Sequence, residues 1–258
     1  MRRFKVNGVE LAWVESGSGE PLVLLHGGNA DRCQFDVFRP LLGPGIRAIA
    51  YDQRDSPDSP CEALAYTADD HACDAALLIE ALGFESVHVM GTSYGGIVAM
   101  TLAIQHPARV KSLVLGATAP SISLFQVPDL SAIRTQGPEA VERFMLGTVV
   151  SADVIDTDAE LVAETRAALR IRSQESLARR MSAVAKHDVR ERLGEIRAPT
   201  LILHGDEDPI VPTDAARMMA ERIAGARLHI LRGSRHGITF QHRRRTADLV
   251  RSFVLSHA

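Results

Sequence analysis

The stretch HVMGTSYGGIVAM, residues 88–100, places Ser93 between Gly91 and Gly95 at the point where an apolar run changes its period. The first half has the pattern of a buried strand and the second half that of a helix, so the serine falls at the turn between them. Three explanations fit such a turn: a tight connection in a packed α/β protein, a phosphate-binding loop, or a strained turn that exposes a nucleophile.

Length and composition exclude several classes of protein. A chain of 258 residues can form one large α/β domain or two small ones, and a net charge of −3 offers no basic excess for binding nucleic acid. We expect no membrane span and no signal peptide, because no apolar run is long enough and the first residues lack an apolar segment. Cys33, Cys61 and Cys73 are odd in number and lack metal-ligand spacing, which favours free thiols in a cytoplasmic protein.

Strand patterns and helix patterns alternate along most of the chain. Asn7-Gly8 predicts a β-hairpin, and residues 68–83 predict a helix that ends at Gly83. The alternation predicts βαβ units and a mostly parallel, doubly wound sheet. The buried strands are expected in PLVLLHGG (21–28), GIRAIAYDQRD (45–55), SVHVMG (86–91), RVKSLVLGA (109–117), APTLILHGDEDPIVP (198–212) and ARLHILRG (226–233).

The alternation stops between residues 120 and 195, where no comparable strand run occurs. This segment instead predicts amphipathic helices around 138–146, 158–171 and 173–186. We therefore expect a core domain made of residues 1–119 and 196–258, interrupted by a helical cap, or lid, at 120–195.

The spacing around Ser93 fits a nucleophile elbow, in which a strained strand-turn-helix exposes the serine. The residues two before and two after the serine must be small because strand and helix approach closely there, and Gly91 and Gly95 meet that demand. A phosphate loop fails, since no G-K-[ST] follows and the glycines do not form G-x-G-x-x-G.

A serine hydroxyl needs a base, and the base needs a group that orients it. Asp206, Glu207 and Asp208 follow one predicted strand, and His236 follows the next. These positions are the carboxyl ends of strands, where open α/β sheets bind ligands, and the order serine, acid, histidine is the one this mechanism requires. The sequence predicts a Ser-His-Asp triad but leaves the choice among the three acids open.

The chain resembles an α/β-hydrolase, of the small capped group that includes cofactor-free haloperoxidases, enol-lactonases, ring-cleavage C–C hydrolases and many esterases. The resemblance covers almost the whole chain and implies a mostly parallel, eight-stranded sheet flanked by helices, with an inserted helical cap. The motifs that carry it are HGG (26–28), YDQRDSPDS (51–59), GTSYGG (91–96), HGDEDPIVP (204–212) and RHG (235–237).

The resemblance also implies roles for single residues. The family's usual spacing selects Asp208 as the acid, with Asp206 as second choice. By similarity, the backbone N–H groups of Gly28 and Tyr94 form the oxyanion hole, while His26 supports the loop that carries Gly28.

One motif departs from the family pattern. The resemblance leads us to expect D-x-R-G-x-G-x-S after the second buried strand, but in DQRDSPDS (52–59) Asp55 stands at the first glycine and Pro57, followed by Asp58, at the second. Aspartate tolerates a positive φ better than most residues, so we expect the turn to survive and Asp55 to have no role near the pocket.

The predicted function is hydrolysis of a small or medium carboxylic ester or lactone through an acyl-enzyme on Ser93, with no metal and no organic cofactor. The alternative is C–C bond hydrolysis of a β-diketone-type ring-cleavage product. From a different class, the fold also serves non-catalytic, receptor-like binders of small molecules. The oligomeric state stays open, with a homodimer among the options.

Substrate choice is expected to reside in the inserted helices. We expect most of the cap's large apolar side chains to pack within the cap and a few to line the site: Leu124, Phe125, Phe144, Met145, Leu146, Leu169, Met181 and Val184. The cap arginines are expected on solvated helix surfaces: Arg166, Arg170, Arg172, Arg179 and Arg180.

Overall fold

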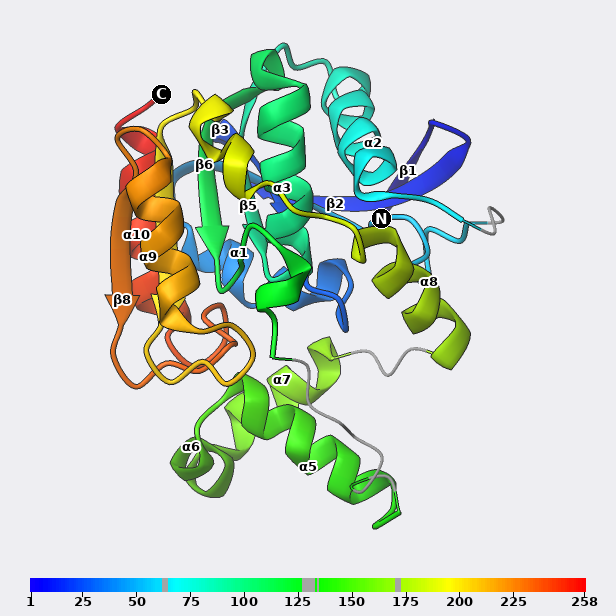
Figure 1. The fold of residues 1–258 in the computed structure, drawn as a ribbon, viewed down its shortest axis with the longest axis vertical. Coiled ribbons are helices and arrows are strands. Elements are labelled where there is room, and N and C mark those ends of the chain that lie inside the picture. Colours follow the sequence, from blue (N-terminus) through cyan, green and yellow to red (C-terminus); the bar gives the residue numbers. More distant parts are fainter. Residues whose placement is uncertain (62–64, 127–132, 134, 170–172) are drawn as a thin grey trace.

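The fold is built on one twisted sheet (Figure 1). In a computed structural model, which describes residues 1–61, 65–126, 133, 135–169 and 173–258, eight strands form a sheet in the order β1-β2-β4-β3-β5-β6-β7-β8. The strands are β1 (Arg2–Val6), β2 (Val9–Gly17), β3 (Gly19–Leu25), β4 (Gly45–Tyr51), β5 (Val87–Thr92), β6 (Val110–Gly116), β7 (Thr200–Gly205) and β8 (Arg227–Leu231).

Strands β3 to β8 run parallel, while β2 is antiparallel to both of its neighbours. The predicted hairpin joins β1 to β2, and its two turn residues both have positive φ, 46° at Asn7 and 75° at Gly8. Such a turn matches the right-handed twist of the paired strands. The mostly parallel sheet that the sequence predicts is thereby confirmed, as are the eight strands that the resemblance implies.

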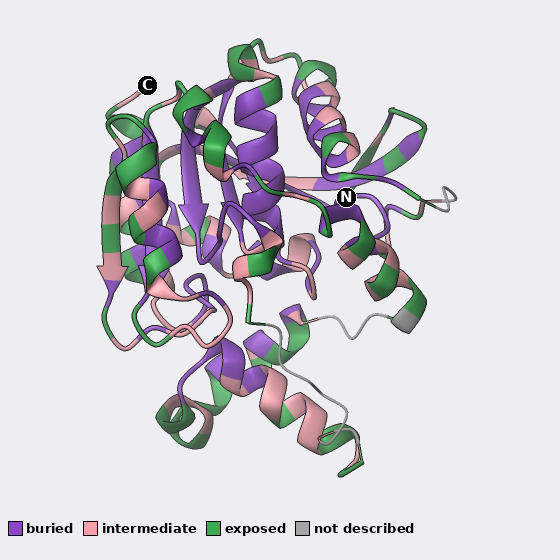
Figure 2. Cartoon of the chain, viewed as in Figure 1, coloured by how far each residue is buried: buried purple, intermediate pink, exposed green. Residues whose placement is uncertain are grey.

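Helices cover both faces of the sheet. Helices α2 (Ala68–Ala81), α3 (Tyr94–Gln105) and α9 (Thr213–Arg222) pack on one face, and α1 (Phe38–Leu41) and α10 (Arg243–Leu255) pack on the other. Each face of the sheet has its own apolar core, and strand β3 contributes to both. Val23 and Leu25 point to the face covered by α2, α3 and α9, and Leu22 and Leu24 point to the other. Figure 2 shows the result: the central strands and most of α3 are buried, while the edge strands β1 and β8 are partly exposed.

The described residues between β6 and β7 form helices and no strand: α5 (Pro138–Val149), α6 (Ala152–Thr157), α7 (Ala159–Ala168) and α8 (Gln174–Val184). Three of these correspond to predicted helices, α6 is additional, and residues 170–172 lie outside the described residues. Helices α5, α6 and α7 lie beyond the ends toward which the parallel strands point, and α8 lies against the side of the core (Figure 1).

The junction of β5, α3 and β3 leaves no room for a side chain at two positions. A Cβ added to Gly91 would lie 2.2 Å from the carbonyl oxygen of Gly95, and one added to Gly95 would lie 2.2 Å from that of Leu25. One opposing atom belongs to the backbone of α3 and the other to the backbone of β3, so neither can move aside without a large cost in free energy. The two glycines therefore set how closely α3 packs on the sheet.

We expect Gly95→Ala to lower the free energy of unfolding by about 3 kcal/mol or more, because the new methyl group overpacks the junction. Gly147→Ala is the matched control, since a Cβ there has no atom within 4 Å and lies in α5. The control should be neutral or stabilising by up to about 1 kcal/mol, because alanine is the better helix former. Urea denaturation measures both, and equal midpoints for the two variants would contradict the packing argument.

Candidate active site

Ser93 occupies the turn between β5 and α3 in a strained backbone conformation, with φ 52° and ψ −119°. The turn is fixed on both sides: the Ser93 amide donates to the carbonyl of Gly116 at 2.9 Å, and the hydroxyl of Thr118 donates to the Ser93 carbonyl at 2.7 Å. Non-glycine residues rarely adopt this conformation, so it persists only where the surroundings impose it. The expected strand-turn-helix is present, with Ser93 at its tip.

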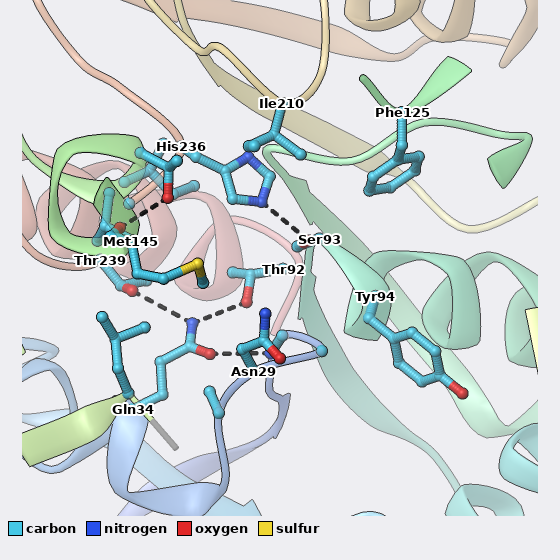
Figure 3. A pocket seen from close by; sticks show the side chains of 18 of the residues that line it. Asn29, Gln34, Thr92, Ser93, Tyr94, Phe125, Met145, Ile210, His236 and Thr239 are labelled. Carbon is cyan, nitrogen blue, oxygen red and sulfur yellow. Dashed lines mark hydrogen bonds between the residues drawn. The ribbon is translucent and has the colours of Figure 1, made fainter. Parts of the chain in front are cut away.

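The turns after β7 and β8 bring two further predicted residues to Ser93. The Nε2 atom of His236 lies 2.9 Å from the Ser93 Oγ, and the Nδ1 atom lies 2.8 Å from the Oδ2 of Asp208. A carboxylate only accepts hydrogen bonds, so the proton of the neutral ring is assigned to Nδ1. The lone pair of Nε2 then faces the serine hydroxyl (Figure 3).

Asp208 is held by its own turn. Its side chain has no exposed surface, and its Oδ1 accepts hydrogen bonds from the amides of Ile210 and Val211 at 2.8 and 3.0 Å. Burial raises the pKa of Asp208, but the neighbouring His236 ring and the amide hydrogen bonds outweigh it, so the pKa lies below its usual range. The second-choice acid, Asp206, instead accepts a hydrogen bond from the Gly233 amide at 2.7 Å.

The two predicted oxyanion donors belong to segments that touch each other. A Cβ added to Gly28 would lie 3.7 Å from that of Tyr94, and one added to Gly27 would lie 3.7 Å from that of Ser93. The loop after β3 thus packs directly on the start of α3. The ring of Tyr94 points away from Ser93, which leaves its backbone on the side of the serine (Figure 3).

His26 supports this loop from behind. Its Nδ1 donates to the Gly27 carbonyl at 2.8 Å, and its Nε2 accepts from the Gln53 amide at 3.2 Å, which together require a neutral ring. The side chain is fully buried and takes no part in lining the cavity above Ser93. The structure thus gives His26 the supporting contact that the resemblance implies.

A cavity of about 250 Å³ opens above Ser93 and His236. Its wall is mostly apolar, and the segment between β6 and β7 contributes much of it: Phe125, Phe144, Met145, Leu169, Leu177 and Met181. More of the expected apolar side chains therefore line the site than the sequence suggested. Of the others, Leu146 and Val184 are buried in the packing and Leu124 packs beside Val211.

Gln34 is a lining residue that sequence reasoning missed. Its side-chain amide hydrogen-bonds the Gly27 amide, the Thr92 hydroxyl and the Thr239 hydroxyl, at 2.8, 2.8 and 3.4 Å (Figure 3). Its sequence context, DRCQFD, contains no motif, so only the three-dimensional contacts reveal it.

Among the residues that the structure describes, no group of three or more His, Cys, Asp or Glu side chains is arranged to hold a metal ion. No helix within the same ranges has the length and apolar character that crossing a bilayer requires.

Ser93, His236 and Asp208 are joined by hydrogen bonds on this sheet. Residues 20–243 of the chain match the family model of the alpha/beta hydrolase fold. The chain belongs to the α/β-hydrolase family. It is accordingly an enzyme of the hydrolase class.

Individual relatives match between 77% and 100% of this chain. A 2-hydroxymuconate semialdehyde hydrolase of Pseudomonas sp. CF600 is 31% identical over 261 residues, covering 96% of this chain and 91% of the relative. A putative carbamate hydrolase of Variovorax paradoxus S110 is 32% identical, covering 77% and 78%. The solved meta-cleavage product hydrolase of Pseudomonas fluorescens IP01 superposes with a TM-score of 0.85 at 25% identity, covering 100% and 98%.

In this α/β-hydrolase the departure at Asp55 has a structural counterpart. Asp55 has a φ of 63°, as a turn built for glycine requires, and its carboxylate accepts hydrogen bonds from Arg179 of α8 and from Tyr66. The Arg179 contacts measure 3.0 and 2.8 Å. The turn survives as predicted. Asp55 does not line the cavity, but its carboxylate ties the core to the helix that supplies Leu177 and Met181. That Asp55 has no functional role at the pocket stays a prediction.

The expectation of solvated cap arginines holds only in part. Arg180 is fully buried, with its guanidinium 4.4 Å from the centre of the Tyr94 ring and its Nη1 donating to the Arg54 carbonyl at 3.0 Å. It is buried because α8 packs onto the start of α3, where the ring offers a cation–π contact. Arg166 pairs with Glu142 near the surface, and Arg170 and Arg172 lie outside the described residues.

We expect Asp55→Asn to lower the free energy of unfolding at pH 7 by about 1–3 kcal/mol, because it weakens charged hydrogen bonds. Burial raises the pKa of Asp55, but hydrogen bonds from Arg179 and Tyr66 outweigh it, so the folded-state pKa lies below the ordinary value. This stabilisation is therefore complete above the unfolded-state pKa of about 3.9 and is lost as pH falls through the folded-state pKa.

Urea denaturation from pH 7 to pH 3 measures the effect. The difference between wild type and Asp55→Asn should stay constant down to about pH 5 and shrink below about pH 4. Asp36→Asn is the control, because its carboxylate is 55% exposed in its ion pair with Arg39 and should shift stability little. A difference that persists unchanged at pH 3 would rule out the charged contact as its source.

Proposed function

We propose that this protein is a serine hydrolase that cleaves small or medium, uncharged carboxylic esters or lactones through an acyl-enzyme on Ser93. The observation that carries the proposal is the 2.9 Å contact between the His236 Nε2 and the Ser93 Oγ, with Nδ1 bonded to the Asp208 carboxylate. This is the hydrogen-bond relay that activates a serine hydroxyl in hydrolases.

The proposed reaction proceeds in two halves. His236 takes the Ser93 proton as the serine oxygen attacks the carbonyl carbon, and the amides of Gly28 and Tyr94 bind the resulting oxyanion. The intermediate expels the alcohol, which receives the proton from His236. A water then repeats the sequence on the acyl-enzyme and frees the acid, while Asp208 stays ionised and stabilises the protonated ring.

We assign residues 120–195 the part of a cap over this site. The support for this is that Phe144 and Met145 of α5 and Leu177 and Met181 of α8 line the cavity above Ser93. Apolar walls exclude water and strengthen the electrostatic contacts made to the reacting carbonyl. The same side chains set the room available for the acyl and leaving groups.

The composition of the wall supports an uncharged substrate. Among the described lining residues, no lysine, arginine, aspartate or glutamate is present, and the polar groups are amides, hydroxyls and His236. An anionic substrate in such a cavity would lose its hydration without gaining a counter-charge, which costs several kcal/mol or more.

C–C bond hydrolysis of a ring-cleavage β-diketone-type product is the second candidate. It is favoured by the 31% identical relative, whose name states that it hydrolyses 2-hydroxymuconate semialdehyde. Substrates named as muconates carry a carboxylate, for which the described wall provides no cation. Arg170 and Arg172 follow the lining residue Leu169 but lie outside the described residues, so a substrate test must compare the two chemistries.

We expect Ser93→Ala to lower kcat/KM for p-nitrophenyl butyrate by at least about 1,000-fold, because the acyl-enzyme can no longer form. Ser112→Ala, a buried serine that contacts His88 outside the cavity, should retain activity. A fluorophosphonate should label the wild type and the Ser112 variant but not Ser93→Ala. Equal turnover by wild type and Ser93→Ala removes Ser93 as nucleophile, and absence of both turnover and label supports a non-catalytic binder.

The acid is tested in the same assay with two matched variants. Asp208→Asn should lower kcat/KM by about 1,000-fold or more, because it removes the partner that fixes the ring tautomer. Asp206→Asn should change it less than about tenfold, since its carboxylate contacts the Gly233 amide. The reverse order would transfer the role to Asp206.

We expect the enzyme to prefer p-nitrophenyl pentanoate over p-nitrophenyl hemisuccinate, which places a carboxylate at nearly the same length. The expected ratio of kcat/KM is at least about tenfold, equivalent to about 1.4 kcal/mol, because the charge is desolvated without a partner. A preference for the hemisuccinate would instead favour the carboxylate-bearing C–C substrates, which a vinylogous diketone acid tests directly.

A further inference from the structure

Gln34 stands where three parts of the site meet. It lies in the short 3-10 turn Arg32–Phe35, its side chain is buried, and it lines the cavity beside Ser93. Its three partners belong to the loop after β3, the last residue of β5 and the loop that follows His236 (Figure 3). These segments carry the proposed oxyanion donor, nucleophile and base.

The contacts fix the orientation of the Gln34 amide. The Oε1 accepts from the Gly27 amide at 2.8 Å, and the Nε2 faces the hydroxyl oxygens of Thr92 and Thr239 at 2.8 and 3.4 Å. A flipped amide would turn its NH₂ group toward the Gly27 N–H, donor against donor. The single acceptor atom and both hydrogens of the NH₂ group are thus engaged by protein.

Gly27 and Gly28 would otherwise be the least constrained residues of the site, because glycine populates a wide range of φ and ψ. The peptide group before Gly27 is held at both ends, its carbonyl by the Gln53 Nε2 at 2.7 Å and its N–H by Gln34. The next peptide is held at its carbonyl by the His26 Nδ1 at 2.8 Å. Since a trans peptide is planar, these contacts also fix the direction of the Gly28 N–H.

We propose that Gln34 is a positioning residue for the oxyanion site: it holds the Gly27–Gly28 loop against the Ser93 turn so that the Gly28 N–H is aimed before substrate arrives. The inference rests on the proposed hydrolysis at Ser93. Oxyanion donors are effective because they need no reorganisation during the reaction, and two adjacent glycines supply no such rigidity themselves.

A direct substrate contact by Gln34 is the less economical explanation. The carbonyl oxygen of the amide is bonded to Gly27 and its NH₂ group to two threonines, so a substrate hydrogen bond would break one of these. The side chain presents an amide whose hydrogen bonds are already made, and its methylene groups, to a mostly apolar cavity. Gln34 therefore affects the reaction indirectly, by holding the Gly27–Gly28 loop.

The test replaces Gln34 by leucine and by methionine, which fill a similar volume without hydrogen bonds. With p-nitrophenyl butyrate, kcat should fall about 10- to 100-fold while KM changes less than about threefold, because the loss falls on the transition state. Gln105→Met is the matched control, since Gln105 is exposed at the end of α3. It should match the wild type.

Two inhibitors separate positioning from a structural role. An alkyl trifluoromethyl ketone forms a tetrahedral oxyanion on the serine, whereas the corresponding methyl ketone binds largely as a ground-state analogue. Inhibition by the trifluoromethyl ketone should weaken by about the same factor as kcat, and binding of the methyl ketone should stay within about twofold. A variant damaged only in stability would show a lower Tm without this selective loss.

The outcomes are distinct. If either variant folds and keeps wild-type kcat and trifluoromethyl ketone inhibition, the positioning role is wrong. Equal weakening of both ketones would make Gln34 a pocket-shaping residue instead and likewise overturn it. If wild type and Ser93→Ala turn over the ester equally, the proposed function is wrong and the inference about Gln34 is wrong with it. If Ser93→Ala is inactive and the Gln34 variants behave like the wild type, only the inference about Gln34 is wrong.

Discussion

The close approach of α3 to the sheet is the constraint on which the rest of the site depends. Gly91 and Gly95 bring helix and strand together until backbone atoms touch, and Ser93 is left at a φ of 52° between them. A conformation of this kind costs about 1–3 kcal/mol and must be offset by its surroundings. Here α3 supplies that support, because nearly all of its residues are buried against the sheet.

Much of the fold and of the site can be predicted because the signals are local. Glycine spacing, continuous apolar runs and acids or histidines at strand ends each occupy a few neighbouring residues, and parallel strands then bring those ends to one edge. These signals indicate Ser93, His236 and an acid among Asp206, Glu207 and Asp208. The choice of Asp208 over Asp206 needed the family resemblance, and the structure supplies the physical difference, a hydrogen bond to His236 in one case and to Gly233 in the other.

The residues that sequence reasoning missed make contacts with partners far away in the chain. Gln34 contacts Thr92 across 58 positions and Thr239 across 205, and Arg179 contacts Asp55 across 124. No periodicity or spacing encodes such pairs, because each side chain taken alone is typical of a polar surface. Arg180 also shows that sequence alone does not reveal long-range packing. Its polar neighbours on α8 predict that it is solvated, and only the packing of that helix against Tyr94 explains its burial.

The segment between β6 and β7, which shapes the cavity, is also hydrogen-bonded to the backbone of the loop that carries His236. The amides of His236 and Gly237 donate to the carbonyls of Thr148 and Val149 at the end of α5, at 3.1 and 3.0 Å. A Cβ added to Gly237 would lie 2.3 Å from the side chain of Val149, so this contact also depends on a glycine. The carboxyl-terminal end of α5 therefore cannot lift from the core without disturbing the loop that aligns His236 with Ser93. Helix α8 is held to the core at other points, by the Arg179 contact with Asp55 and by the buried Arg180 on the Tyr94 ring.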